Sequence, residues 1–280
     1  DHRNRHDHRN RHRNYRVITF ANGFAVGYDD VGAGIPVLFL HGFPHNRSLW
    51  APQLGALATP ARTITMDLRG FGESVPGRAV SVDDYADDAA ALLDVLGIDR
   101  AVVAGLSMGG YAALAFWRRH GARVRALVLC DTKAGADDDA ARAARRKMQA
   151  LARDGGSAAI ANGMIGGMVG PTTRLNNPEL VDELHRMMSL APEDGVGGAL
   201  DALMSRPDST ATLATINVPT LIIVGEEDAL TPATEARTMH LAIGGSRLEI
   251  IAGAGHVSNA ERPATFNHAL SEFLVSLTAQ

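Results

Sequence analysis

The chain has 280 residues, of which 46% are hydrophobic and 21% are charged, and its formal net charge is −4. This length supports a large core, either in one α/β domain or in one domain with an insertion. No apolar run approaches the roughly 20 residues that span a bilayer, so we expect no membrane insertion. The single cysteine, Cys130, excludes an intrachain disulfide and a cysteine metal cluster, so we predict no metal site and a cytoplasmic location.

Residues 1–14 repeat Asp, His, Arg and Asn and contain no apolar position. Such a segment cannot bury enough surface to offset its ordering entropy, so we predict a disordered polar tail. The tail holds five arginines, which leaves the rest of the chain mildly acidic and argues against nucleic acid as a partner. The sequence leaves a homo-oligomer open.

Strand and helix patterns alternate along most of the chain. A hairpin is expected from Arg16–Phe20 and Phe24–Tyr28, followed by the strands Pro36–Leu40, Arg62–Met66, Ala101–Leu106, Val124–Leu129, Thr220–Val224 and Arg247–Ile251. Helices are expected at Asp83–Leu96, Met108–His120 and Pro263–Leu277. This alternation predicts an α/β fold with a parallel sheet and right-handed crossovers.

The alternation stops between Asp131 and about Val218. Only helix-like stretches remain there, at Ala136–Arg153, Ser157–Met168, Pro178–Leu190 and Val196–Arg206. We interpret residues 133–215 as a helical cap, inserted between two core segments, 15–132 and 216–280, and folded over the carboxyl edge of the sheet, where open α/β sheets bind ligands.

Six of the nine methionines lie in this interval, namely Met148, Met164, Met168, Met187, Met188 and Met204. Ordinary helix packing explains any one of them. As a group they predict a pliable lining for varied acyl or aryl groups, with at least one methionine facing the pocket.

Ser107 is the predicted nucleophile. It lies in Gly105-Leu106-Ser107-Met108-Gly109, directly after an apolar strand and directly before a helix. A serine on such a sharp turn is held at positive φ with its hydroxyl clear of the backbone, and the glycines let strand and helix close on each other. A glycine-rich turn without function is the alternative interpretation.

A serine hydroxyl needs an adjacent base, and His256 is the best candidate among the histidines outside the tail. It lies in a glycine-rich loop that leaves the last predicted strand. The imidazole needs an acceptor on its other nitrogen, and both Asp228 and Asp131 follow predicted strands. We favour Asp228, with Asp131 as the alternative acid, because the chain order Ser107, Asp228, His256 is that of a nucleophile-elbow hydrolase.

Two backbone amides are candidates for an oxyanion hole. One is the amide of Met108, at the start of the helix after the serine, where the helix partial charge favours an anion. The other is the amide of Phe43, in the turn His41-Gly42-Phe43-Pro44 after the strand that ends at Leu40.

Together these segments resemble the successive signatures of the α/β-hydrolase superfamily. Three further segments carry the same resemblance, namely Asp67-Leu68-Arg69-Gly70-Phe71-Gly72-Glu73-Ser74, Gly225-Glu226-Glu227-Asp228 and Gly255-His256. The resemblance implies an eight-stranded, mostly parallel sheet with a helical cap after the sixth strand, a serine triad and no cofactor. The 67–74 loop is similar to a structural turn of that family, and we assign it no catalytic role.

Within that superfamily the Phe43 and Met108 combination is similar to arylesterases, cofactor-free perhydrolases and 3-oxoadipate enol-lactonases. We therefore expect a serine esterase that cleaves carboxylic esters with short to medium acyl chains. A lactonase with the same triad is the first alternative, with Arg174 or another cap arginine pairing with a substrate carboxylate. A non-catalytic receptor for a small molecule is the second.

Overall fold

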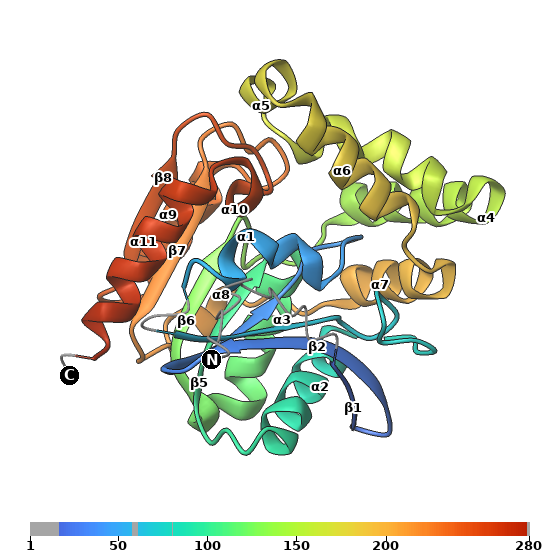
Figure 1. Cartoon of the computed structure of the whole chain (residues 1–280). Helices are drawn as coiled ribbons and strands as arrows, with labels where there is room; N and C mark the ends of the chain where they lie inside the picture. Colours follow the sequence, from blue (N-terminus) through green and yellow to red (C-terminus); the bar gives the residue numbers. More distant parts are fainter. Residues whose placement is uncertain (1–16, 58–60, 80, 279–280) are drawn as a thin grey trace, which may run out of the picture.

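The computed structural model describes residues 17–57, 61–79 and 81–278, so the predicted tail at 1–14 lies outside the described residues. Its centre is an eight-stranded sheet (Figure 1). The strands are β1 (Val17–Ala21), β2 (Phe24–Gly32), β3 (Ile35–Leu40), β4 (Ala61–Met66), β5 (Ala101–Leu106), β6 (Val124–Cys130), β7 (Thr220–Gly225) and β8 (Arg247–Ile251).

The strand order is β1-β2-β4-β3-β5-β6-β7-β8. β2 runs antiparallel to β1 and β4, whereas all pairs from β4 to β8 are parallel. The hairpin turns on Asn22 and Gly23 alone, and β2 continues to Gly32, beyond the predicted end at Tyr28. The eight-stranded, mostly parallel sheet implied by the sequence is confirmed.

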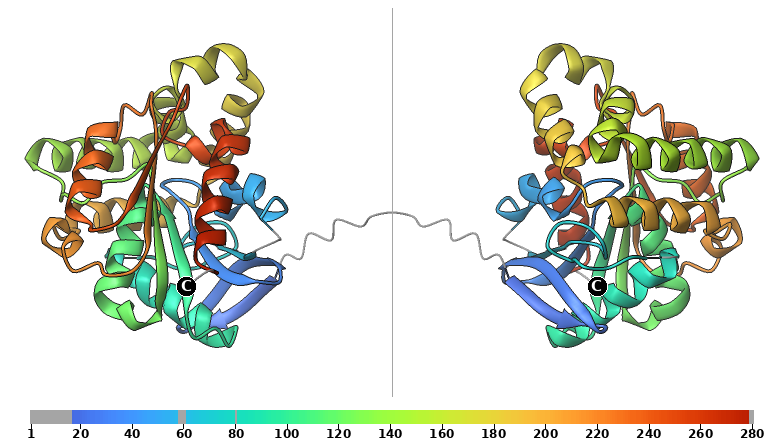
Figure 2. Two further views of the ribbon diagram at one scale, coloured as in Figure 1. Left: turned by 90° about the vertical axis from the view of Figure 1, so that its left-hand side faces the viewer. Right: turned by 90° about the vertical axis from the view of Figure 1, so that its right-hand side faces the viewer.

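The helices outside the β6–β7 connection are α1 (Ala51–Leu54), α2 (Val82–Val95), α3 (Met108–His120), α9 (Ala233–Ala242), α10 (Ser258–Glu261) and α11 (Pro263–Ser276). Side chains of α2, α3 and α9 share one buried cluster with one face of the sheet, and α11 shares another cluster with the opposite face. Figure 2 shows this layering, with helices on both sides of the strands. Because β3, β5, β6 and β7 are covered on both faces, they are almost entirely apolar and buried.

Helices alone connect β6 to β7. They are α4 (Asp139–Met168), α5 (Pro171–Asn176), α6 (Pro178–Ser189), α7 (Glu193–Ser205) and α8 (Thr210–Leu213). α4 contains a kink at Gly156, where φ is +66°, and this kink separates the two helices that the sequence predicted there. Figure 1 shows α4, α5 and α6 gathered at one end of the molecule.

None of the helices in the described part of the chain combines the length and the apolar character that a membrane crossing requires.

Candidate active site

The turn between β5 and α3 places Ser107 in a strained conformation. Its φ is 54° and its ψ is −112°, and α3 begins at the next residue. A Cβ atom on Gly105 would collide with the carbonyl oxygen of Gly109, and one on Gly109 would collide with the carbonyl oxygen of Leu40. Glycine is therefore required on both sides of the serine, because strand and helix approach each other more closely than any side chain permits.

Loops after β7 and β8 bring a histidine and a carboxylate to this serine. His256 Nε2 lies 2.8 Å from Ser107 Oγ, and His256 Nδ1 lies 2.8 Å from Asp228 Oδ2. The side chains of His256 and Asp228 are 3% and 0% exposed. The three residues therefore form one continuous hydrogen-bonded chain, in which His256 and Asp228 are almost completely shielded from solvent and Ser107 is partly exposed to the cavity.

Asp228 is held by its own loop. Its Oδ1 accepts the backbone amides of Leu230 at 2.8 Å and Thr231 at 2.9 Å, and the Thr231 hydroxyl donates to Oδ2 at 2.7 Å. Burial raises the pKa of this carboxyl, but the charge of His256 and these donors lower the pKa by more, so it lies below its usual value. For His256 the balance is reversed: burial lowers its pKa, and Asp228 raises it above 6.5.

Asp131, the alternative acid, is buried nearby but has other partners. Its Oδ1 accepts the amide of Gly225 at 2.8 Å, and its Oδ2 accepts the Ser258 hydroxyl at 2.6 Å. No hydrogen bond joins it to His256 among those of the described residues. Burial and the charge of Asp228 raise the pKa of Asp131 to about 8. Asp131 has a φ of 45°. Through its two partners it ties the end of β6 to the end of β7 and to the start of α10, in the segment that follows β8.

The ring of His41 fixes the turn after β3 and so orients the backbone amide of Phe43. Burial lowers the pKa of His41 to about 4, so the ring is neutral near pH 7. Its Nε2 accepts the Leu68 amide at 3.0 Å, which leaves the proton on Nδ1 to donate to the Gly42 carbonyl at 2.9 Å. In a trans peptide the carbonyl and the following N–H point in opposite directions, so fixing the Gly42 carbonyl also aims the Phe43 N–H.

Neither the Phe43 nor the Met108 amide donates to another group among the hydrogen bonds of the described residues. Both residues line the cavity that contains Ser107. The arrangement therefore leaves two backbone donors available to an oxygen atom bound beside the serine.

A sequence profile for the α/β hydrolase fold matches residues 35–263. The chain belongs to the α/β-hydrolase fold family. Among its relatives is 3-oxoadipate enol-lactonase 1 of Acinetobacter baylyi, 29% identical over 248 residues, which cover 86% of this chain and 89% of that protein.

Two solved structures illustrate the likeness. A thermophilic esterase from Thermogutta terrifontis, solved with malate bound, has a TM-score of 0.89 and 38% identity, covering 94% of this chain and 98% of that one. The enol-lactonase from Burkholderia xenovorans has a TM-score of 0.86 and 26% identity, covering 92% of this chain and 100% of that one.

The Ser107 cavity of this α/β hydrolase has a volume of about 390 Å³. Its wall combines side chains of the sheet-edge loops with side chains of α4 and α7. Three of the six methionines noted in the sequence line it, Met148, Met164 and Met168, so the prediction that at least one faces the pocket is confirmed. Its charged side chains are Lys133, Asp137 and Arg145, which sequence reasoning did not select.

The sequence also gave no signal for Glu261, which holds the histidine loop of this hydrolase. Its carboxylate accepts the amides of Gly255 at 2.8 Å and Val257 at 3.3 Å, the residues on either side of His256, and that of Gly170 at 2.9 Å. A glutamate in the short helix α10 reads as a surface residue, and only the tertiary structure reveals its role.

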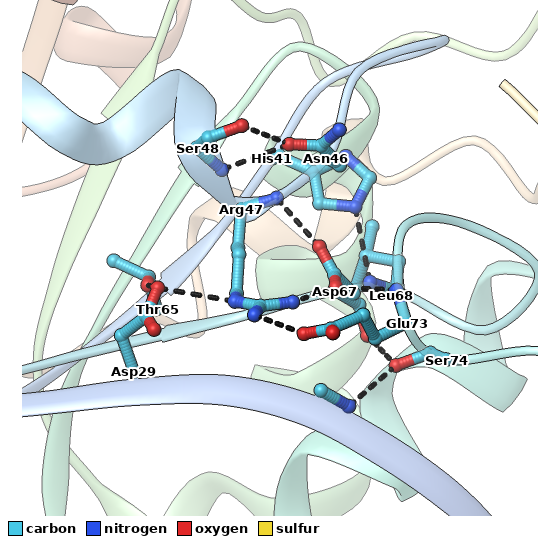
Figure 3. Close-up of polar contacts among 11 residues, drawn as sticks. Asp29, His41, Asn46, Arg47, Ser48, Thr65, Asp67, Leu68, Glu73 and Ser74 are labelled. Atoms are coloured by element: carbon cyan, nitrogen blue, oxygen red, sulfur yellow. Dashed lines mark hydrogen bonds and ion pairs between the residues drawn. The ribbon is translucent and has the colours of Figure 1, made fainter. Parts of the chain in front are cut away.

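The 67–74 loop of the hydrolase is a structural ionic network (Figure 3). The buried guanidinium of Arg47 binds Asp67, Glu73 and Asp29, the last at 3.0 Å. A cavity of about 330 Å³ adjoins these groups, but its charged side chains form ion pairs with one another. The sequence-based interpretation of this loop as a structural turn is consistent with these contacts.

Four other histidines lie away from the serine. His120 and His185 contact Asp87 and Asn162 at 2.8 and 2.7 Å, and His268 faces Glu272 at 3.4 Å. His240 lies within α9, where its Nδ1 contacts the Ser246 hydroxyl at 2.9 Å.

Proposed function

We propose that this protein is a serine hydrolase that cleaves carboxylic esters of short to medium acyl chains through an acyl-enzyme intermediate. The observation that carries the proposal is the continuous hydrogen-bonded chain from Asp228 through His256 to Ser107, on the wall of a cavity of about 390 Å³. The esterase and enol-lactonase relatives support the same chemistry.

In this reaction His256 Nε2 accepts the proton of Ser107 Oγ while that oxygen attacks the ester carbonyl carbon. The carbonyl oxygen becomes an oxyanion, held by the amides of Phe43 and Met108. The imidazolium, stabilised by Asp228, then gives its proton to the leaving alcohol as the C–O bond breaks. Water enters, loses a proton to His256 Nε2 and attacks the acyl carbon. The imidazolium then returns that proton to Ser107 Oγ as the C–O bond to the serine breaks, which releases the acid and restores both residues.

We assign residues 133–215 the role of a cap as part of this proposal. The wall of the cavity supports it, because Met148, Met164 and Met168 of α4 and Leu203 of α7 face the same space as Ser107. The backbone amide of His256 also donates to the Met168 carbonyl at 3.1 Å, which links the cap directly to the catalytic loop.

A lactonase with the same three residues is the second candidate function. Two enol-lactonases among the relatives favour it, as do the cationic side chains in the cavity wall. Arg174, the candidate from the sequence, is not among the residues that line this cavity, and its guanidinium binds the Gly166 carbonyl.

The test is hydrolysis of p-nitrophenyl acetate and p-nitrophenyl butyrate by the wild type and by Ser107→Ala. The variant should lose about 10⁴-fold or more in kcat and keep the wild-type unfolding temperature. Ser276→Ala is the matched control, because that serine lies at the end of α11 and its hydroxyl donates, among the described residues, to the Phe273 carbonyl alone. Turnover by Ser107→Ala would refute the proposed nucleophile, and a stoichiometric burst without further turnover would favour a receptor.

A further inference from the structure

Three cationic side chains lie at or directly behind the wall of the Ser107 cavity. Lys133 and Arg145 line it, and the guanidinium of Arg206 stacks 4.2 Å from the ring centre of Tyr111, itself a lining residue. Asp137 is the one carboxylate in the wall. Its two oxygens bind Arg145 Nε and Arg206 Nη1, each at 2.7 Å, so both arginines share a single counter-charge.

Lys133 differs from these arginines because no carboxylate of the described residues lies within 4 Å of its ammonium group. The neighbouring acids are committed elsewhere. Asp228 is bonded to His256 and to its own loop, and Asp131 to Gly225 and Ser258. Lys133 is itself only partly exposed, so water does not fully solvate it. Three cationic side chains therefore share a single carboxylate, and of the three only Lys133 has no ion-pair partner among the described residues.

Position also sets Lys133 apart. It follows Asp131 and Thr132 directly, at the end of β6, and the Thr132 hydroxyl donates to the Ser107 carbonyl at 2.9 Å. The lysine is thus anchored by the backbone next to the nucleophile and not by α4. A ligand whose scissile carbonyl lies at Ser107 shares the cavity with the ammonium group, and the rest of the wall is mainly apolar.

On the basis of the proposed hydrolase function, we propose that Lys133 is a specificity-determining residue that binds the carboxylate of an anionic substrate. The substrate class is a small ester or lactone with a free carboxylate a few carbons from the scissile carbonyl, such as the half-ester of a dicarboxylic acid. The substrate carboxylate forms an ion pair with the Lys133 ammonium group. The carbon chain between the carboxylate and the scissile carbonyl packs against the apolar part of the cavity wall. A charge-assisted contact of this kind contributes about 1.5–3 kcal/mol, which corresponds to about 10- to 100-fold in affinity.

The experiment compares an anionic ester with its neutral counterpart. Monoethyl adipate and ethyl hexanoate have the same acyl length and differ mainly in the terminal carboxylate, and acid release from both is followed by pH-stat titration. Lys133→Met should raise KM for monoethyl adipate by about 10- to 100-fold and leave kcat/KM for ethyl hexanoate within about twofold. Lys133→Arg, which keeps the charge, should retain most of the preference.

The chain offers a matched control, because its only other lysine is Lys147, an exposed residue of α4. Lys147→Met removes the same charge outside the cavity wall. It should change neither KM nor kcat/KM for either ester. If Lys133→Met does not fold, competitive inhibition of the wild type by adipate and by hexanamide gives the same comparison. Adipate should then inhibit at least about tenfold more strongly.

The outcomes separate this inference from the proposed function. If Lys133→Met affects both esters equally, or neither, while Ser107→Ala is inactive, the hydrolase remains and the assignment of Lys133 is overturned. If the wild type cleaves neither ester, or if Ser107→Ala cleaves them, the proposed function itself fails.

Discussion

Asp228→Asn should inactivate the hydrolase by reversing the tautomer of His256. In the wild type Asp228 Oδ1 accepts the amides of Leu230 and Thr231, and Oδ2 faces His256 Nδ1 at 2.8 Å. An asparagine would keep its carbonyl oxygen on the two amides, because only an oxygen can accept them, and would turn its NH₂ toward Nδ1. The ring would then carry its proton on Nε2, which faces Ser107 and could no longer accept the serine proton.

The magnitude follows from the geometry of the ion pair. Unit charges 2.8 Å apart attract each other by about 6 kcal/mol at an effective dielectric constant of about 20, which is worth about four powers of ten in rate. In a serine protease of unrelated fold the same change costs about 10⁴ in kcat. We therefore expect Asp228→Asn to lower kcat by about 10³- to 10⁴-fold.

The assay is kcat/KM for p-nitrophenyl butyrate between pH 5 and pH 9, with Asp131→Asn measured alongside. Burial lowers the pKa of His256 and Asp228 raises it by more, so Asp228→Asn should also move the acid limb of the profile to lower pH. Asp131→Asn should keep most of the activity. Equal losses in the two variants, or full activity in Asp228→Asn, would refute the assignment of the acid.

Three other changes test the supporting structure. Burial lowers the pKa of His45 to about 3, below its unfolded value, so the wild type loses stability as pH falls below about 6.5. His45→Leu lacks this loss, so between pH 7 and pH 5 its free energy of unfolding, measured by urea titration, should rise by up to about 2 kcal/mol relative to that of the wild type. An equal change in the free energy of unfolding of both proteins between the two pH values would contradict this. Glu261→Gln leaves a buried amide without an acceptor and should cost about 1–3 kcal/mol in the free energy of unfolding, whereas the exposed Glu249→Gln should cost little. A Cβ on Gly42 would lie 3.0 Å from Leu106 Cδ2 and 3.3 Å from Ser107 Cβ, so Gly42→Ala should displace the Phe43 amide and lower kcat by up to about 100-fold without unfolding the protein.

The strands and long helices could be predicted because their signals are local. β5, α3 and β8 have the predicted bounds, since a run of buried apolar residues or a helical period needs no information from the rest of the chain. The short helices α1, α5, α8 and α10 have four to six residues, too few to display a period, and the sequence did not indicate them.

Residues whose roles depend on meeting distant segments were harder to predict. Lys133 and Glu261 gave no signal, because a lone lysine or glutamate beside a loop or short helix is normally a surface residue. Arg174 was considered for the substrate acid since it is a cationic residue of the helical segment, yet its guanidinium is satisfied by the Gly166 carbonyl of the same segment. Charge alone does not show whether a side chain reaches a cavity.

The choice between Asp131 and Asp228 shows what the missing information is. Both residues follow neighbouring parallel strands, β6 and β7, so topology alone brings both carboxylates to the edge of the sheet where Ser107 lies. The difference is in local backbone geometry. Asp131 has a positive φ and is bound by Gly225 and Ser258. Asp228 accepts the amides of Leu230 and Thr231 of its own loop and directs Oδ2 at His256. Two acids cannot both serve the same Nδ1–H, so the one whose loop supplies its own donors is free to face the histidine. The other acid joins the ends of β6 and β7 to the start of α10.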